Sequence, residues 1–204
     1  MKLFLFDFDG VLVDSLDVYE KTVSDCLIKI NQPLTRGREE FLELFEGNFY
    51  ESLVQKGVDL EEFVKASVEI LAEVQIKDIK PIAGVVPVVE ELHKQHCLII
   101  ISSNETASIK EALELFKYDG YFREILGSDF MLSKKDKILY AIKKYQLSTD
   151  NIYYIGDTTG DIKEGKQAGV KTVGVTWGWH SKEKMAAAQP DYLFGNPVEL
   201  LQLK

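Results

Sequence analysis

Three runs of the chain are apolar throughout and a fourth is largely apolar, and together they predict the strands of a buried parallel sheet. A half-exposed strand alternates polar and apolar residues, so an uninterrupted apolar run indicates a strand covered on both faces. The last run is less regular, since Lys171 and Gly174 interrupt it. The runs are LFLF at 3–6, CLIII at 97–101, IYYI at 152–155 and VKTVGV at 170–175.

Between these runs, the apolar residues follow the spacing of amphipathic helices. They recur at intervals of three and four positions from Ile109 to Phe116 and again from Ile138 to Tyr145. Buried strands that alternate with such helices predict an α/β protein with a doubly wound parallel sheet, a Rossmann-like core.

Residues 16–80 interrupt this alternation, because they contain no strand-like run. One helical stripe extends from Leu16 to Ile30 and another from Leu60 to Leu71, and Pro81 with Gly84 marks the return to the sheet. The pattern predicts a small all-helical domain inserted after the first strand, at 16–80. The core would then consist of residues 1–15 and 81–204.

Composition excludes several classes of partner. Of the 204 residues, 46% are apolar and 28% charged, as in ordinary soluble domains. A net charge of -9 disfavours nucleic acid and anionic membranes, which both attract basic surfaces.

No apolar run is long enough to span a bilayer, and no signal peptide is apparent. Cys26 and Cys97 lie in apolar stretches and are expected to be buried free thiols, as in a cytoplasmic protein.

Polar residues follow three of the four predicted strands. Asp7 and Asp9 follow the first, Ser102, Ser103 and Asn104 follow the second, and Asp157 with Asp161 follows the third. Ligands of open parallel sheets bind beyond the carboxyl ends of the strands. Converging carboxylates there would repel each other without a cation, and their oxygens suit a hard ion such as Mg²⁺.

Each aspartate taken alone also has a structural explanation. Any of them could belong to a turn, and Asp161 directly precedes IKEGKQA, where it could cap a helix. A calcium-binding EF-hand is excluded, because Val11 occupies the third ligand position and Val18 replaces the closing glutamate. Walker, dinucleotide-binding and serine-hydrolase motifs are absent from the sequence.

The motifs together resemble the haloacid dehalogenase superfamily, in its phosphatase branch. DFDGVLVDS is similar to the first motif, Asp-x-Asp-Gly-Thr/Val, and IIISSN to the second, a strand that ends in Ser or Thr. SKKDK resembles the lysine motif, although the usual Pro-x-Pro after the lysine is missing, and YYIGDTTGD resembles the fourth motif. The helical insertion matches the family's small cap in position and size but not in sequence.

The resemblance implies a role for each acidic residue. Asp7 would be the nucleophile that forms an aspartyl phosphate, and Asp9 the general acid and base. Asp7, Asp9, Asp157 and Asp161 would hold Mg²⁺, with Asp161 further out. Gly10 would let the backbone pass close to the phosphate.

Two residues are candidates for the motif serine, and two are candidates for the motif lysine. Ser102 is favoured for binding the phosphoryl oxygens, while Ser103 with Asn104 also fits the family's second motif. Lys134 is favoured over Lys135 for neutralising Asp7, since Asp136 then stands where the family often has an acidic residue. A solvated run of charges is the alternative for KKDK. His180, after TWGW, is expected at the surface.

The resemblance therefore implies a phosphoric monoester hydrolase, similar to phosphoglycolate phosphatases, that acts on a small phosphorylated metabolite with Mg²⁺. Sugar phosphates and nucleoside monophosphates both remain open as substrates. The alternative is a phosphomutase of the same superfamily acting on a sugar phosphate. A regulatory protein that only holds phosphate is a third possibility.

Overall fold

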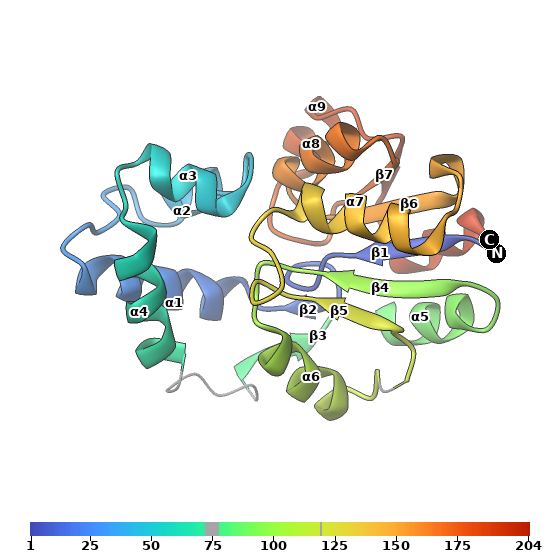
Figure 1. The fold of residues 1–204 in the computed structure, drawn as a ribbon, viewed down its shortest axis with the longest axis horizontal. Helices are drawn as coiled ribbons and strands as arrows, with labels where there is room; N and C mark the ends of the chain where they lie inside the picture. Colours follow the sequence, from blue (N-terminus) through green and yellow to red (C-terminus); the bar gives the residue numbers. More distant parts are fainter. Residues whose placement is uncertain (72–77, 119) are drawn as a thin grey trace.

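The computed structural model describes residues 1–71, 78–118 and 120–204 (Figure 1). Residues 72–77, which belong to the predicted insertion, lie outside the described residues. Two parts are visible: an α/β core that contains both termini, and a group of helices to one side of it.

The core is built on a six-stranded sheet in the order β5-β4-β1-β6-β7-β8, and every neighbouring pair is parallel. The first strand of the chain is thus central, between β4 and β6. This confirms the predicted doubly wound parallel sheet. The strands are β1 (Leu3–Phe6), β4 (Cys97–Ile101), β5 (Glu124–Leu126), β6 (Ile152–Gly156), β7 (Lys171–Val175) and β8 (Tyr192–Phe194).

Strand β1 is buried on both faces, as its apolar run predicts. Its alternate side chains belong to two different cores: Leu3 and Leu5 pack towards α7 and α8, whereas Phe4 and Phe6 pack towards α5 and α6. All four have no exposed surface. The rest of the sheet is therefore assembled around a strand that cannot shift without exposing one of the cores.

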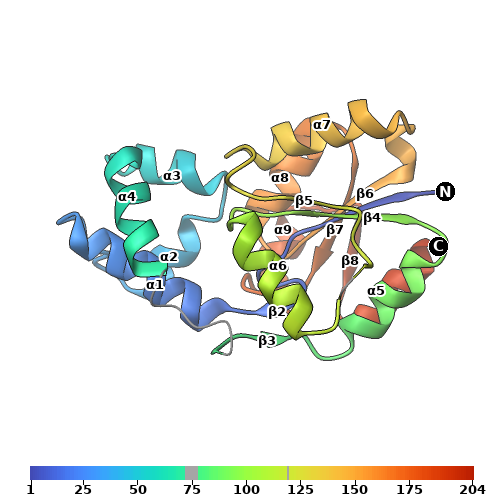
Figure 2. The ribbon, with the colours of Figure 1, turned by 60° about the horizontal axis from the view of Figure 1, so that its bottom comes forward.

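Helices cover both faces of the sheet (Figure 2). The helices α7 and α8 pack together on one face, while α5, α6 and a C-terminal 3-10 helix cover the other. The short helix α9 contacts β7. Their bounds are α5 (Val85–His93), α6 (Thr106–Leu115), α7 (Lys134–Tyr145), α8 (Thr159–Ala168), α9 (Lys182–Ala187) and the 3-10 helices Thr149–Asn151 and Pro197–Leu203.

Among the described residues, the side group contains four α-helices with an apolar core of their own. Aromatic residues fill much of it, including Phe41, Phe45, Phe49 and Phe63, and Trp179 of the core domain packs among them. A short antiparallel pair of strands, β2 and β3, lies where the chain leaves the core and returns. The bounds are α1 (Leu16–Lys29), α2 (Arg38–Glu43), α3 (Phe49–Gln55), α4 (Leu60–Leu71), β2 (Val13–Asp14) and β3 (Lys80–Pro81).

The sequence pattern predicted the long strands and missed the short ones. All four predicted strands form, including the interrupted run at β7. The edge strands β5 (EIL) and β8 (YLF) have only three residues each and are partly exposed, so both are too short to stand out as apolar runs. Cys26 and Cys97 are buried free thiols, as expected. Within the described part of the chain, no helix has the length and apolarity needed to cross a membrane.

The central position of β1 generates a stability prediction. Replacing Leu5 with alanine would leave a cavity in a fully buried layer, and we expect the free energy of unfolding to fall by about 2–5 kcal/mol. Leu139→Ala is the matched control, because this leucine of α7 is 44% exposed and its loss should cost under about 0.5 kcal/mol. Urea denaturation of both variants measures the difference, and equal losses would contradict the central role of β1.

Candidate active site

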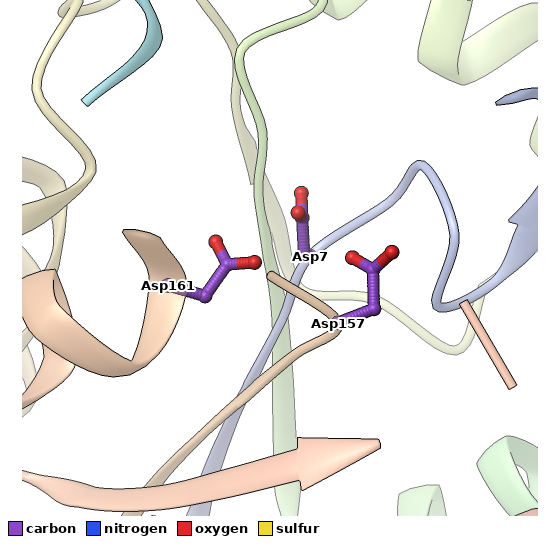
Figure 3. A group of neighbouring side chains, drawn as sticks. All are labelled: Asp7, Asp157 and Asp161. Carbon is purple, nitrogen blue, oxygen red and sulfur yellow. The ribbon is translucent and has the colours of Figure 1, made fainter. Parts of the chain in front are cut away.

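Three buried carboxylates meet at the carboxyl edge of the sheet (Figure 3). Asp7 directly follows β1, Asp157 directly follows the neighbouring strand β6, and Asp161 lies in the first turn of α8. The three side chains offer oxygen atoms that lie within 4.8 Å of one another. Because adjacent parallel strands end at one edge, residues 150 positions apart in the sequence become neighbours here.

Lys134 connects two of these carboxylates. It is the first residue of α7, and its Nζ donates to Oδ2 of Asp7 and to Oδ1 of Asp161, both at 2.7 Å. The lysine is only 8% exposed. Burial acts to lower the pKa of Lys134, but the charges of Asp161 and Asp7 outweigh it and raise the pKa well above its ordinary value. A permanent positive charge therefore lies beside Asp7.

Both oxygens of Asp161 already accept hydrogen bonds. Oδ1 accepts from Lys134 and, at 2.8 Å, from the hydroxyl of Tyr154, while Oδ2 accepts from the backbone N–H and the hydroxyl of Thr158. Thr158 in turn accepts from the N–H of Asp161, which completes a capping box at the start of α8. Asp161 is thus both a helix-capping residue and a partner of Lys134.

Among the described residues, hydrogen-bond donors reach only one of the two carboxylate oxygens of Asp157. Its Oδ2 accepts from the backbone N–H of Trp179 at 2.7 Å, whereas the fully buried Oδ1 has no hydrogen-bond partner among the described residues. An unpaired buried carboxylate oxygen is costly. Burial raises the pKa of Asp157 well above its ordinary range, and the nearby charges of Asp161 and Asp7 raise it further. A cation at Oδ1 would relieve both effects.

The donor set fits a hard divalent cation. Asp7 and Asp157 supply carboxylate oxygens from neighbouring strands, and the unpaired Oδ1 of Asp157 is available for a metal. Asp161 completes the acidic group, although each of its oxygens is shared with two donors. This arrangement suits Asp7 and Asp157 as direct ligands and Asp161 as a residue that acts through Lys134 or through water.

Asp9 is held separately from this group. Its Oδ1 accepts from the hydroxyl of Ser15 at 2.7 Å, and the residue is only 8% exposed. Burial raises the pKa of Asp9, while the hydrogen bond from Ser15 partly opposes the rise. Burial also raises the pKa of Asp7, to about 7, against the opposing charge of Lys134. The two aspartates therefore differ in their partners, since Asp7 faces a cation and Asp9 a hydroxyl.

Gly10 packs against Asp157. Its φ is +73°, and a Cβ placed there would lie 2.0 Å from Oδ2 of Asp157, so only glycine fits. Its N–H donates to the carbonyl of Val13 within the turn that follows β1. In this structure Gly10 allows the turn to approach the carboxylate closely, and its N–H is engaged locally.

The two serines after β4 lie in different surroundings. Ser103 lines the small cavity beside Asp7 and Asp9, whereas Ser102 is fully buried, with its Oγ accepting from the N–H of Asn104 at 3.0 Å. The geometry thus favours Ser103 over Ser102 as the residue that faces a phosphoryl group. Lys134 rather than Lys135 reaches Asp7, since the N–H of Lys135 donates to Glu164 and its side chain lines a separate pocket.

The helical group covers the carboxylates. The remaining cavity beside them has a volume of about 10 Å³, which is about the space of one water molecule. Tyr19 of α1 and Phe45 after α2 close it from the helical side, and both contact the ring of Trp179. Asp7, Asp157 and Asp161 are accordingly only 5%, 0% and 1% exposed in this arrangement of the two parts.

Sequence reasoning missed a second buried lysine. Lys137 has no exposed surface, and its Nζ donates to the carbonyl of Ser102 at 2.5 Å. A signal was present, because Lys134, Lys137, Ile138 and Ala141 follow the spacing of one helix face, and the last two are apolar. Burial, followed by the charge of Lys134, lowers the pKa of Lys137 to about 7.

His180 corrects another expectation. It is 2% exposed instead of lying at the surface, because its ring lies between the core and the helical group. Its Nδ1 accepts from the N–H of Thr159 at 3.0 Å, and its Nε2 lies 3.0 Å from the carbonyl of Leu42. Nothing in the local sequence pattern indicated this, since both partners are distant backbone groups.

A family model of haloacid dehalogenase-like hydrolases matches residues 4–175, which is most of the chain. The chain belongs to this family. The match includes most of β1, all of β4 and β6, and the helices α1, α2, α3 and α4. The resemblance carried by the aspartate, serine, lysine and glycine-aspartate motifs is thereby confirmed.

Relatives with curated names agree with this assignment. The chain is 25% identical to a phosphoglycolate phosphatase of Haemophilus influenzae over 222 residues, covering 99% of this chain and 97% of that protein. It is 27% identical to a phosphoglycolate phosphatase of Synechococcus elongatus, with coverage of 99% and 96%. The family and these relatives support a phosphoric monoester hydrolase.

Solved structures share the fold. The crystal structure of a predicted phosphatase from Clostridium acetobutylicum superposes with a TM-score of 0.84 at 24% identity, covering 98% of this chain and 96% of that one. The structure of a predicted phosphoglycolate phosphatase from Haemophilus somnus gives a TM-score of 0.78 at 25% identity, with coverage of 100% and 97%. The helical group is thus part of a shared architecture.

The buried Lys137 generates a pH prediction. Its pKa is about 7 in the folded protein and about 10.5 when exposed, so between these values the unfolded chain binds more protons and stability rises with pH. Between pH 7 and about 10.5, the free energy of unfolding of the wild type should rise by up to about 1.4 kcal/mol per pH unit relative to that of Lys137→Met. Urea unfolding at several pH values from 7 to 10 measures this.

The control for this prediction is Lys143→Met, at an exposed position of the same helix. Its difference from the wild type, measured at the same pH values, is the baseline with which the Lys137→Met difference is compared. A Lys137→Met difference that changes no more with pH than this baseline would show that the buried amine keeps its ordinary pKa.

Proposed function

We propose that this hydrolase is a Mg²⁺-dependent phosphatase that cleaves small phosphomonoesters through an aspartyl phosphate on Asp7. The observation that carries the proposal is the position of Asp7, which accepts a hydrogen bond from the ammonium group of Lys134 and belongs to the same acidic group as Asp157, whose Oδ1 is unpaired among the described residues. Phosphoryl transfer requires charge neutralisation around the transferring group more than covalent chemistry by the protein. The site concentrates such groups around one carboxylate.

Asp7 is the proposed nucleophile. One carboxylate oxygen attacks phosphorus while the bond from phosphorus to the leaving oxygen breaks, which gives the aspartyl phosphate and an alcohol. Its Oδ1 accepts from the N–H of Phe8 at 2.7 Å and its Oδ2 from Lys134, so both oxygens are held in place. Lys134 would also attract the oxygens of the transferring phosphoryl group.

Asp9 is the proposed proton carrier. In its protonated form it donates to the leaving oxygen, and as a carboxylate it then removes a proton from the water that attacks phosphorus. That second step breaks the bond between phosphorus and the Asp7 oxygen and releases inorganic phosphate. The raised pKa of Asp9 supports this role, because a general acid must hold its proton near the working pH.

Mg²⁺ would be held by Asp7 and Asp157, with Asp161 supporting the site through Lys134. When bound, it would neutralise the negative charge of the phosphoryl oxygens. Ser103 and Asn104, just before α6, are the proposed hydrogen-bond partners of those oxygens, and Ser102 supports the loop by accepting from Asn104.

The helical group is the proposed cap, a domain of about residues 16–80 on a core of 1–15 and 81–204. The small volume beside Asp7 supports a cap that moves aside to admit a substrate, since a phosphoryl group needs more room than one water molecule. The relatives' name, phosphoglycolate phosphatase, supports a small phosphorylated metabolite as the substrate class.

Asp7→Asn tests the nucleophile. We expect it to lower the hydrolysis of p-nitrophenyl phosphate in Mg²⁺ by at least about 1,000-fold, because an amide cannot form the aspartyl phosphate. Asp14→Asn is the matched control: it makes the same change at an exposed residue of the same motif and should keep wild-type turnover. Circular dichroism checks that both variants fold. Wild-type activity in Asp7→Asn would refute the mechanism, and full activity in excess EDTA would refute the metal.

Asp9→Asn separates the two chemical steps. The p-nitrophenolate ion leaves without a proton, so the variant should still form the aspartyl phosphate but hydrolyse it slowly. Intact-mass measurement after acid quenching should then show the mass of one added phosphoryl group, which Asp7→Asn should lack. An Asp9→Asn protein that turns over at the wild-type rate would exclude the proposed role of Asp9.

A further inference from the structure

Two cavities lie between the helical group and the core, next to the carboxylates. The larger has a volume of about 180 Å³ and extends from α1, α3 and α4 to Ser103 and Asn104. The smaller, of about 130 Å³, is lined by Asp9 and Ser15. Tyr19 lines both of them and also the small cavity beside Asp7. The three spaces therefore meet at one tyrosine.

The position of Asp9 identifies which part of a substrate these cavities would receive. Asp9 lines both the small cavity beside Asp7 and the 130 Å³ cavity. A group that accepts a proton from Asp9 while its phosphorus faces Asp7 must extend away from Asp7, into the space beyond Asp9. The leaving alcohol would thus lie in the two larger cavities.

The described residues of these cavity walls carry no positive charge. None of the described residues that line either cavity is lysine or arginine. The walls are apolar side chains, such as Val23, Phe49 and Phe63, interspersed with hydroxyl groups, such as those of Thr22 and Ser67. The charged residues that line the cavities, apart from Asp9, are also acidic: Glu105, Glu111 and Asp129.

Among the described residues, the lysine beside Asp7 does not supply a cation to the two larger cavities either. Lys134 lines only the small cavity, and its Nζ is already bonded to Asp7 and Asp161. A carboxylate or second phosphate on the leaving alcohol would lose its water in these cavities without gaining an ionic partner. It would also be repelled by three acidic side chains.

We propose that the physiological substrate is a phosphomonoester whose leaving alcohol carries no anionic group, being either uncharged or amine-bearing. The proposal rests on the proposed function of the same site. It distinguishes this hydrolase from the curated relatives, whose name specifies phosphoglycolate, an ester whose leaving group carries a carboxylate. Apolar walls with hydroxyl groups suit a polyol or an amino alcohol.

Three two-carbon substrates test the proposal at constant size. They are 2-hydroxyethyl phosphate, O-phosphoethanolamine and 2-phosphoglycolate, whose leaving groups are neutral, cationic and anionic. We expect kcat/KM for 2-phosphoglycolate to be at least about 10-fold below the better of the other two, at low ionic strength where charges act most strongly. Released inorganic phosphate is measured for each, with p-nitrophenyl phosphate as the reference substrate.

A pair of charge-reversal variants tests the cause. Glu111 and Glu114 are both exposed residues of α6, but only Glu111 lines a cavity. Glu111→Lys should raise kcat/KM for 2-phosphoglycolate relative to 2-hydroxyethyl phosphate by about 3-fold or more, as an added cation attracts the carboxylate. Glu114→Lys makes the same change in net charge and should leave that ratio unchanged.

The outcomes separate this inference from the proposed function. Hydrolysis of p-nitrophenyl phosphate together with a preference for 2-phosphoglycolate over both other esters would overturn the substrate class and leave the mechanism intact. A ratio that changes equally in Glu111→Lys and Glu114→Lys would overturn the electrostatic explanation. If no ester is cleaved, p-nitrophenyl phosphate included, the proposed function fails and the substrate class fails with it.

Discussion

The ion pairs of Lys134 with Asp7 and Asp161 determine how the rest of the site can be arranged. Three carboxylates offer oxygen atoms within 4.8 Å of one another in a buried region, and the buried ammonium group of Lys134 offsets part of their repulsion through Asp7 and Asp161. The lysine comes from α7, Asp7 from the end of β1 and Asp161 from α8, so the same ion pairs also fix two helices against the central strand. The same ion pairs therefore both balance the charge of the carboxylates and hold the two helices in position.

The three carboxylates differ in how many hydrogen bonds they accept, and this difference suits distinct chemical roles. Among the described residues, the side chain of Asp161 has four hydrogen-bond donors, that of Asp7 has two, and that of Asp157 has one together with a buried oxygen left unpaired. The fully bonded residue is the least able to take on a new ligand, and the unpaired oxygen is the most able. This gradient supports a metal position at Asp157 and Asp7, away from Asp161.

The helical group contributes a different kind of constraint. Its aromatic core packs on Trp179, and His180 bridges backbone groups of both parts, so the cover over the carboxylates is a specific contact surface. Beyond that cover, the cavity walls lack cations among the described residues and present acidic ones. On the proposed function, Asp9 and Tyr19 would connect the chemistry at phosphorus with the recognition of the leaving alcohol, since both residues line the small cavity and the 130 Å³ cavity.

The sequence by itself determined the central sheet, because runs such as LFLF and CLIII can only be buried on both faces. It also selected the aspartates after β1 and β6 and the lysine of SKKDK, since a motif carries residue type and spacing. The edge strands β5 and β8, the burial of Lys137 and His180, and the cavity position of Ser103 rather than Ser102 were decided only by the tertiary structure. Each of these depends on groups distant in the sequence, such as the Ser102 carbonyl that Lys137 contacts, and local periodicity contains no information about which distant groups will meet.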